Sequence, residues 1–265
     1  MLPGEAEVSP IHERQFSLDG QVAVVTGASG GIGSAGALAL AEAGADVALI
    51  GRNRAKLDAA ADAVKAAGRR ALVIEAEVTD EAAVNAAAAE VEAGLGPADI
   101  LFNNAGITSP RLLADLPLDE WQRVIDVNLT GAYLCCRAFA PAMRAKKHGR
   151  IINMGSILSG RGMATRTVYS ASKAGLANLG AALCFELGPH GITVNTIGAT
   201  VIVTDLNREL VRTQPELYGE VVRRTALGRL GEISDVTGVL VFLASPAAGF
   251  ITGQTLYVDG GYTAG

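Results

Sequence analysis

A glycine-rich turn directly after a short apolar run is the feature that most constrains the fold of this 265-residue chain. The run at residues 22–25 predicts a buried strand, and glycines crowd the turn at residues 26–33. Gly27 permits a tight bend, Gly31 lets the backbone approach a pyrophosphate, and Gly33 lets the following helix pack closely on the strand. The start of that helix directs free N–H groups at phosphates. The turn therefore predicts a βαβ unit that binds a dinucleotide.

The same succession of strand and helix repeats along the chain. Apolar runs at residues 47–50, 71–76, 100–103, 151–154, 193–197 and 255–258 alternate with helical patterns at 32–43, 54–67, 81–93, 118–144, about 169–187 and 233–244. This alternation predicts an α/β fold with a parallel sheet and helices on both faces. We expect an N-terminal arm at residues 1–17 and a single domain at 18–265, because no linker divides the chain. Residues 200–228 return to no strand, which predicts a lid or an oligomer contact.

Composition excludes several classes of protein. Hydrophobic residues make up 49% and charged residues 18%, which fits a soluble globular chain, and the net charge of −5 argues against nucleic-acid binding. No apolar run approaches the ~20 residues that cross a bilayer, and the acidic N-terminus is not typical of a targeting signal. Cys135, Cys136 and Cys184 have no metal-ligand spacing. We therefore expect a cytoplasmic protein with no metal, no membrane partner and no nucleic-acid partner.

A tyrosine and a lysine four residues apart, Tyr169 and Lys173, indicate a catalytic site that transfers a proton. This spacing places both side chains on one helix face, where a cation favours the phenolate of a tyrosine that otherwise titrates near pH ~10. The pair also occurs on ordinary amphipathic helices, so it gains meaning from the glycine turn and from Ser156 upstream. Together these features predict an enzyme that binds a dinucleotide and moves a hydride and a proton.

Six motifs occur in order along the chain. They are residues 26–33, Asn-Asn-Ala-Gly at 103–106, Val-Asn-Leu at 127–129, the Ser156 segment, Tyr169 with Lys173, and Val-Asp-Gly-Gly at 258–261. In these motifs the chain resembles the classical short-chain dehydrogenase/reductase family, and the resemblance extends over residues 18–262. It implies a Rossmann-type, doubly wound, mainly seven-stranded parallel sheet in three αβα layers. It also implies a nicotinamide cofactor, frequent assembly as a homotetramer, and a catalytic tetrad at Asn128, Ser156, Tyr169 and Lys173.

The resemblance implies a role for each member of the tetrad. Tyr169 would donate a proton to a carbonyl oxygen during reduction, and its phenolate would accept the alcohol proton during oxidation. Lys173 would lower the pKa of Tyr169 and hydrogen-bond the nicotinamide ribose. Ser156 would hold the substrate oxygen where negative charge develops. Asn128 would hold a water that relays protons to Lys173, although a satisfied helix kink is the structural alternative.

The end of the second strand decides between the two nicotinamide cofactors. An acid there would bind the ribose 2′-hydroxyl of NAD, but this chain has Gly51 followed by Arg52, whose guanidinium could clamp a 2′-phosphate. We therefore expect NADP(H) to be preferred, with NAD(H) possible. Gly30 stands where many NADP-using relatives carry a second basic residue. The expected cofactor contacts are Gly27, Ser29, Gly31, Ile32, Gly33, Arg52, Glu77, Val78, Asn104, Ala105, Gly106, Tyr169, Lys173 and Thr204.

The expected substrate-facing segments are residues 108–112, 157–163 and 201–210. They carry apolar patches interleaved with nearby arginines, namely Arg111, Arg161, Arg166 and Arg208. These could bind a carboxylate or a sugar acid, although solvated surface arginines are as common. Residues 199–200 are Ala-Thr where the family usually has Pro-Gly, which changes the loop on the nicotinamide side.

The function that follows is an NAD(P)-dependent oxidoreductase that interconverts a secondary alcohol and a ketone. Its small-molecule substrate would be a polar keto or hydroxy compound such as a sugar, polyol or keto acid. A 3-oxoacyl-(acyl-carrier-protein) reductase is the alternative, and a silent cofactor sensor, a scaffold, a lyase or an epimerase would be another class of protein. Apolar residues on the helices at 118–144 and 170–187 predict a dimer of dimers. They are Ala132, Ala138, Leu176, Leu179 and Leu183.

Overall fold

A seven-stranded parallel sheet forms the centre of the molecule. The computed structural model describes residues 11, 15–205 and 207–265. The strand order is β3-β2-β1-β4-β5-β6-β9, and every neighbouring pair is parallel. The strands are β1 (Val22–Thr26), β2 (Asp46–Gly51), β3 (Ala71–Glu75), β4 (Ile100–Asn103), β5 (Gly149–Met154), β6 (Ile192–Ala199) and β9 (Thr255–Val258). The predicted doubly wound α/β fold with seven strands is confirmed.

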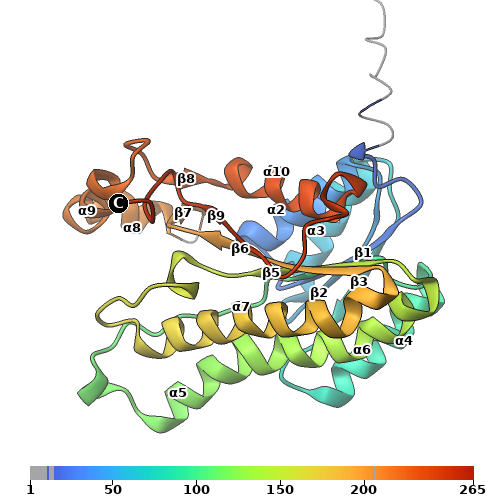
Figure 1. Ribbon diagram of the computed structural model, residues 1–265, viewed down its shortest axis with the longest axis horizontal. Helices are drawn as coiled ribbons and strands as arrows, with labels where there is room; N and C mark the ends of the chain where they lie inside the picture. Colours follow the sequence, from blue (N-terminus) through green and yellow to red (C-terminus); the bar gives the residue numbers. More distant parts are fainter. Residues whose placement is uncertain (1–10, 12–14, 206) are drawn as a thin grey trace, which may run out of the picture.

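Helices cover both faces of this sheet (Figure 1). One layer contains α2 (Gly31–Glu42), α3 (Arg54–Ala66) and α10 (Ile233–Ala244). The opposite layer contains α4 (Glu81–Gly94), α6 (Gly131–Lys146) and α7 (Thr167–Leu187). Short 3₁₀ turns occur at Leu113–Asp115, Ile157–Ser159, Gly188–His190 and Pro246–Ala248. The molecule therefore has the three αβα layers that the sequence predicts.

The first strand shows why the chain adopts this layering. Ala23 and Val25 pack into the core beneath α2 and α10, whereas Val22 and Val24 pack into the core beneath α4 and α6. Successive side chains of a strand point to opposite faces, so a strand that is apolar at every position must be covered on both. The continuous apolar run thus requires two helical layers.

The order of the strands also determines where a ligand can bind. The chain proceeds outward from β1 through β2 to β3, then returns to place β4 on the other side of β1. The loops that leave β1 and β4 therefore run to opposite faces, which opens a crevice at the carboxyl ends of these strands. Both the glycine turn and the Asn-Asn-Ala-Gly motif lie at this switch point.

The predicted long helix at residues 118–144 contains a turn that the sequence did not reveal. It comprises α5 (Leu118–Ile125), a π-helical turn at Asp126–Thr130, and α6. Asn128 lies within the π-helical turn and is 1% exposed. Such turns widen a helix locally and often occur at functional sites.

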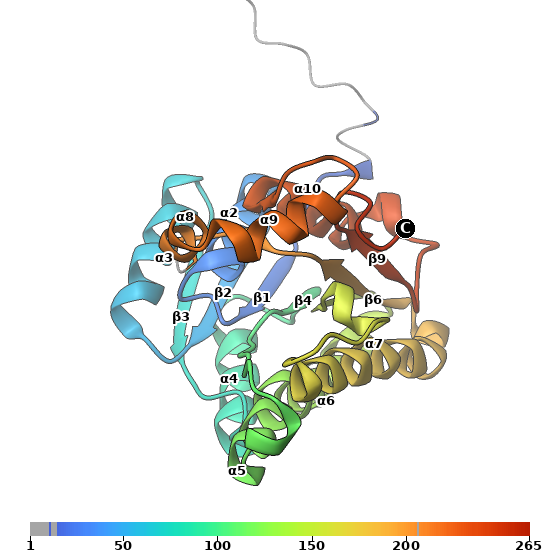
Figure 2. The ribbon, with the colours of Figure 1, turned by 90° about the vertical axis from the view of Figure 1, so that its left-hand side faces the viewer.

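The segment at residues 200–228 differs from the sequence-based expectation. The prediction that it returns to no strand is wrong, because β7 (Ile202–Val203) pairs in parallel with β8 (Gly231–Glu232). A two-residue strand is too short to produce a detectable periodicity. The segment continues through α8 (Arg208–Thr213) and α9 (Pro215–Arg224), which lie together at one end of the molecule (Figures 1 and 2).

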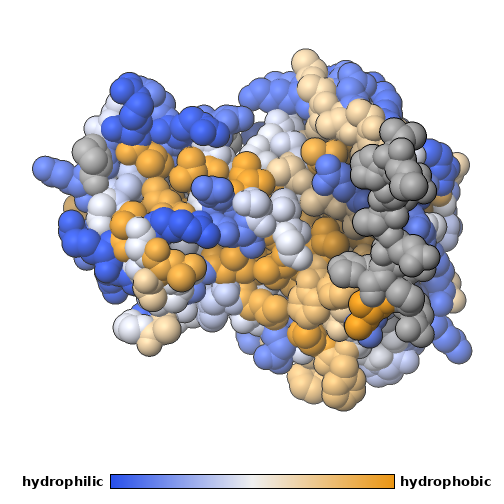
Figure 3. Space-filling view, turned by 90° about the horizontal axis from the view of Figure 1, so that it is seen from above, coloured by the Kyte–Doolittle hydropathy of each residue, from blue (hydrophilic) through white to orange (hydrophobic). Residues whose placement is uncertain are grey.

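That end of the molecule is rich in charge. In Figure 3 it carries mostly hydrophilic side chains with apolar patches between them.

Of the predicted N-terminal arm, residues 1–10 and 12–14 lie outside the described residues. Across the part of the chain that is described, no helix combines the length and apolarity needed to span a bilayer.

Candidate active site

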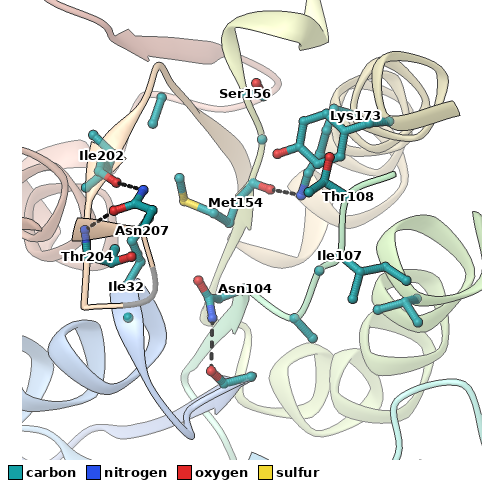
Figure 4. Close-up of a pocket in the computed structure, with 18 of the residues that line it drawn as sticks. Ile32, Asn104, Ile107, Thr108, Met154, Ser156, Lys173, Ile202, Thr204 and Asn207 are labelled. Atoms are coloured by element: carbon teal, nitrogen blue, oxygen red, sulfur yellow. Dashed lines mark hydrogen bonds between the residues drawn. The ribbon is translucent and has the colours of Figure 1, made fainter. Parts of the chain in front are cut away.

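A pocket of about 1160 Å³ occupies the crevice at the carboxyl ends of the strands. It is lined by the glycine turn, the ends of β2 and β3, the loop after β4, the segment after β5, the start of α7 and the segment after β6. Figure 4 shows side chains from these elements facing one another across the pocket. All the expected cofactor contacts except Gly33 line it, as do Ser156, Tyr169 and Lys173 of the tetrad.

The glycine turn packs so tightly at Gly27 and Gly33 that these two positions exclude a side chain. Gly27 has a φ of +64°, and a Cβ atom there would lie 2.9 Å from Cα of Ala105. A Cβ atom at Gly33 would lie 2.2 Å from the carbonyl oxygen of Gly27. Gly33 therefore lies beneath the pocket rather than in its lining, where it permits the close packing of α2 that the sequence predicts.

Hydrogen bonds lock the glycine turn to the loop after β4. The side-chain amide of Asn104 donates to the carbonyl oxygens of Thr26 and Gly27, at 3.1 and 3.3 Å. The hydroxyl of Thr26 accepts from the backbone N–H groups of Asn104 and Ala105, both at 3.1 Å. Sequence reasoning overlooked Thr26, although its position just before the first glycine of the motif could have indicated its role.

The far end of the pocket holds the charged residues that follow β2 and β3. Nη1 of Arg52 lies 3.3 Å from Oε2 of Glu77, and the two side chains are 71% and 37% exposed. An ion pair this exposed contributes little stability, so Arg52 can leave it for another anion at small cost. Lys56, near the start of α3, lines the same pocket. It is a second cation that the sequence analysis did not identify, because a single lysine at the start of a helix matches no motif.

The chemical end of the pocket brings Ser156, Tyr169 and Lys173 together. Nζ of Lys173 lies 5.6 Å from the centroid of the Tyr169 ring. It donates to the carbonyl oxygen of Met154 at 2.6 Å (Figure 4). The hydroxyl of Ser156 accepts from the backbone N–H of Leu158 at 3.1 Å and caps a short 3₁₀ turn. The predicted helical spacing thus places the phenol and the ammonium on one wall.

Burial is the main cause of the pKa shifts of both members of this pair. Burial raises the pKa of Tyr169, while Ser156 and Arg166 act in the opposite direction. Burial also lowers the pKa of Lys173 to about 8. Lys173 is not among the groups that shift the pKa of Tyr169 in this structure, so the expectation that it lowers this pKa stays a prediction.

Asn128 lies behind the pocket rather than in its lining. Its Oδ1 accepts from the backbone N–H of Ile107 at 2.8 Å, and its Nδ2 donates to the Ile107 carbonyl at 2.9 Å. Nδ2 also donates to the hydroxyl of Ser172 at 3.0 Å, a partner that the sequence analysis did not identify. A Cβ atom at Gly106 would lie 3.3 Å from Oδ1 of Asn128 and 3.4 Å from Nζ of Lys173. The asparagine therefore holds in place the loop at residues 106–107, which lies against Lys173.

The segment after β6 closes the pocket opposite α7. Asn207 accepts from the backbone N–H of Thr204 at 2.7 Å and donates to the carbonyl oxygen of Ile202 at 2.8 Å (Figure 4). A Cβ atom at Gly31 would lie 3.8 Å from Cγ2 of Thr204, so this segment reaches the glycine turn. Sequence reasoning found Thr204 but missed Asn207, whose side chain holds this bend in place.

The Ala-Thr pair that replaces Pro-Gly continues the sheet. Ala199 is in register with Val258 of β9, and the backbone N–H of Thr200 donates to the Val258 carbonyl at 3.4 Å. Thr200 lines the pocket, and its buried hydroxyl oxygen has no hydrogen-bond partner among the described residues. The loop therefore presents a polar atom to the pocket where glycine would present none.

Known proteins resemble this chain along almost all of its length. The family model described as "Enoyl-(Acyl carrier protein) reductase" matches residues 27–263. The chain is 40% identical to the short-chain reductase protein NovJ of Streptomyces niveus, over 91% of this chain and 93% of that protein. It is 41% identical to a 3-oxoacyl-(acyl-carrier-protein) reductase of Synechocystis sp., over 92% of this chain and 98% of that protein.

A similar solved structure is that of a gluconate 5-dehydrogenase from Burkholderia cenocepacia, which contains NADP and tartrate. It is 38% identical to this chain with a TM-score of 0.90, and the alignment covers 94% of this chain and 98% of that one.

Proposed function

The chain belongs to the short-chain dehydrogenase/reductase family, and from that premise we propose that it is an NADP(H)-preferring enzyme that interconverts a ketone and a secondary alcohol. As a member of this family it is an oxidoreductase that acts on CH–OH or carbonyl groups. The observation that carries the proposal is the shared pocket. Ser156, Tyr169 and Lys173 line the same space as the glycine turn, so a proton donor lies within reach of a dinucleotide-binding site.

The residues present fit a dinucleotide. The turn at residues 27–33 keeps two of its positions free of side chains, since Cβ atoms at Gly27 and Gly33 would collide with neighbouring atoms. Its backbone therefore lies open at the start of α2, where free N–H groups and the helix dipole favour phosphates. Asn104, Ala105 and Gly106 line the next part of the pocket. A bound nicotinamide would supply the hydride, and the chain would supply the rest of the chemistry.

The tetrad residues divide that remaining chemistry among them. The phenol of Tyr169 gives a proton to the substrate oxygen in reduction and takes it back in oxidation. The hydroxyl of Ser156 holds the same oxygen, and it also opposes the rise in the pKa of Tyr169. The ammonium of Lys173 would hydrogen-bond the ribose of a bound nicotinamide cofactor. Asn128 positions the Ile107 backbone beside Lys173, and a water held there would carry protons to it.

Cofactor choice provides the first test. Arg52 and Lys56 both line the end of the pocket after β2, and Arg52 can exchange Glu77 for a 2′-phosphate. We expect NADPH to exceed NADH in kcat/KM, and Arg52→Ala to reduce that ratio by roughly ten- to a hundredfold, mainly through KM for NADPH. Steady-state kinetics with both cofactors measure this. Arg54→Ala, in the exposed pair with Asp58 outside the pocket lining, is the matched control. Better use of NADH by the unmodified protein would refute the preference.

Two substrate classes fit the pocket. A polar keto or hydroxy acid is supported by the cations around the pocket and by the similarity to a gluconate 5-dehydrogenase. A 3-oxoacyl thioester is supported by the similarity to 3-oxoacyl-(acyl-carrier-protein) reductases. The test is a scan of NADPH oxidation with 5-keto-gluconate, L-sorbose, acetoacetate and acetoacetyl-coenzyme A. We expect a keto acid to give the highest kcat/KM. A higher value for the thioester would favour the second class, and NADPH binding without oxidation would indicate a silent sensor.

Assembly is a separate proposal. Ala132 and Leu176, two residues expected at an interface, are buried within the chain itself at 8% and 1% exposure, so they are not available for one. Tyr133 on α6 and Phe185 on α7 are instead 44% and 82% exposed on the two adjacent helices. We propose a dimer of dimers in which α6 and α7 pair across a two-fold axis. Light scattering at micromolar concentration should give the mass of a tetramer. A monomer mass would contradict it.

A further inference from the structure

The cations and acids that line the pocket do not balance at its chemical end. The acids of the lining are Glu77 and Asp205. Glu77 pairs with Arg52 at the opposite end, and Asp205 pairs with Arg208 at 3.1 Å. Arg166 and Lys173 also line the pocket, and within the described part of the chain neither forms an ion pair. The wall beside the tyrosine is therefore positively charged without a compensating carboxylate.

Arg166 is held in place by its backbone and by one hydrogen bond. Its backbone N–H donates to the backbone carbonyl of Met163 at 3.1 Å, and its own backbone carbonyl accepts from the backbone N–H of Ser170 at 2.7 Å. Its Nη1 donates to the hydroxyl of Thr108 at 3.3 Å, which joins the start of α7 to the loop after β4. The side chain is partly buried. A guanidinium has five N–H donors, so this neutral contact leaves most of them available.

No carboxylate among the described residues forms an ion pair with Arg166. Arg111, whose backbone forms a bridge with that of Arg166, pairs through its own side chain with Glu120 at 2.6 Å. The charge of Arg166 acts on Tyr169, since it lowers the pKa of the phenol that burial raises. An anion bound to Arg166 would therefore lie in the same pocket as the reacting group.

We infer that Arg166 binds a carboxylate of the substrate, so that the enzyme acts on keto and hydroxy acids in preference to their neutral counterparts. The inference rests on the proposed oxidoreductase function. A planar guanidinium matches a carboxylate with two parallel hydrogen bonds, and partial burial strengthens such contacts. Ile157, Leu158 and Tyr262 form an apolar cluster in the same pocket that suits a carbon skeleton.

The test compares acetoacetate with methyl acetoacetate, which share the reacting ketone and differ in the anionic group. We expect the unmodified enzyme to favour the acid in kcat/KM. Arg166→Gln should lower kcat/KM for acetoacetate by roughly ten- to a hundredfold, mainly through KM, and change the value for the ester less than about threefold. Arg166→Lys should give an intermediate loss, because it keeps the charge but not the planar fork. Arg144→Gln, which removes an exposed cation from α6, should leave both values unchanged.

The acid and the ester of the comparison separate the possible outcomes. An effect of Arg166 on Tyr169 alone would reduce turnover of acid and ester equally, and that result would overturn the inference. A preference of the unmodified enzyme for the methyl ester would do the same while the proposed function stands. Titration of acetoacetate into the enzyme saturated with NADP⁺ gives a readout without turnover, and equal affinity in Arg166→Gln also counts against the inference. If no carbonyl compound oxidises NADPH, the proposed function fails and the inference with it.

Discussion

Replacing Tyr169 with phenylalanine is expected to lower kcat by roughly 10²–10⁴-fold while the fold and the affinity for NADPH are retained. The substitution removes one hydroxyl from a partly buried side chain that lines the pocket with Ser156 and Lys173. General acid–base catalysis is lost, whereas the glycine turn that would hold the cofactor is untouched. Single-turnover kinetics and NADPH fluorescence titration measure the two quantities separately. Tyr257→Phe, at a partly exposed tyrosine of β9 outside the pocket lining, is the matched control.

The pH dependence gives an independent check on the same residue. Burial raises the pKa of Tyr169 and so favours the neutral phenol. A rise in pH converts this phenol into the phenolate that accepts the alcohol proton. Oxidation should therefore become faster with rising pH and reduction slower, through one group that is missing in Tyr169→Phe. If Tyr169→Phe keeps most of its turnover on an established substrate, the tyrosine is a structural residue and the proton donor lies elsewhere.

Replacing Lys173 with methionine is expected to lower kcat by roughly 10²-fold or more and to weaken NADPH binding as well. Lys173 is 3% exposed and reaches the pocket between Met154 and Gly106. Its ammonium would hydrogen-bond the ribose of the cofactor and would also stabilise the phenolate form of Tyr169. Methionine preserves the length and the burial, so a loss reports the missing charge and its hydrogen bonds. Kinetics and fluorescence titration measure both effects, with Lys65→Met on the exposed surface of α3 as the control.

The lowered pKa of Lys173 predicts the sign of a further effect. Because burial brings this pKa down to about 8, the free lysine carries its charge below that pH and loses it above. An anionic ligand favours the charged form, so NADPH affinity should be greatest below about pH 8 and fall as the pH rises past it. Lys173→Met should show no such decline between pH 7 and 9. An affinity that is independent of pH in the unmodified protein would contradict this role.

The sequence predicts the layers and the position of the pocket because both depend on local patterns. The apolar residues of β1 alternate between two cores, and Gly27 and Gly33 after it would collide with their neighbours if a Cβ were added. Spacing on one helix likewise predicts that Tyr169 and Lys173 share a wall. These features follow from the chain around each residue.

Features that depend on distant segments could not be predicted in this way. The Arg52–Glu77 pair joins the ends of two strands, and Lys56 enters the pocket from α3. The raised pKa of Tyr169 reflects burial by several elements, which no spacing of charged residues reveals. The π-helical turn at Asn128 could not be predicted from the sequence either, because its residues match an ordinary helical pattern.

The most direct test of the proposed function follows the hydride itself. NADPH that carries deuterium at C4 of the nicotinamide, on one face at a time, would be incubated with the enzyme and the best carbonyl substrate of the scan. Mass spectrometry and NMR of the alcohol product then locate the label. We expect deuterium at the former carbonyl carbon with one of the two labelled cofactors only, and a product of single chirality, since the pocket holds both reactants in one orientation. An alcohol product without deuterium from either cofactor, or NADPH that binds and is never oxidised, would contradict the assignment of this chain as a hydride-transferring carbonyl reductase.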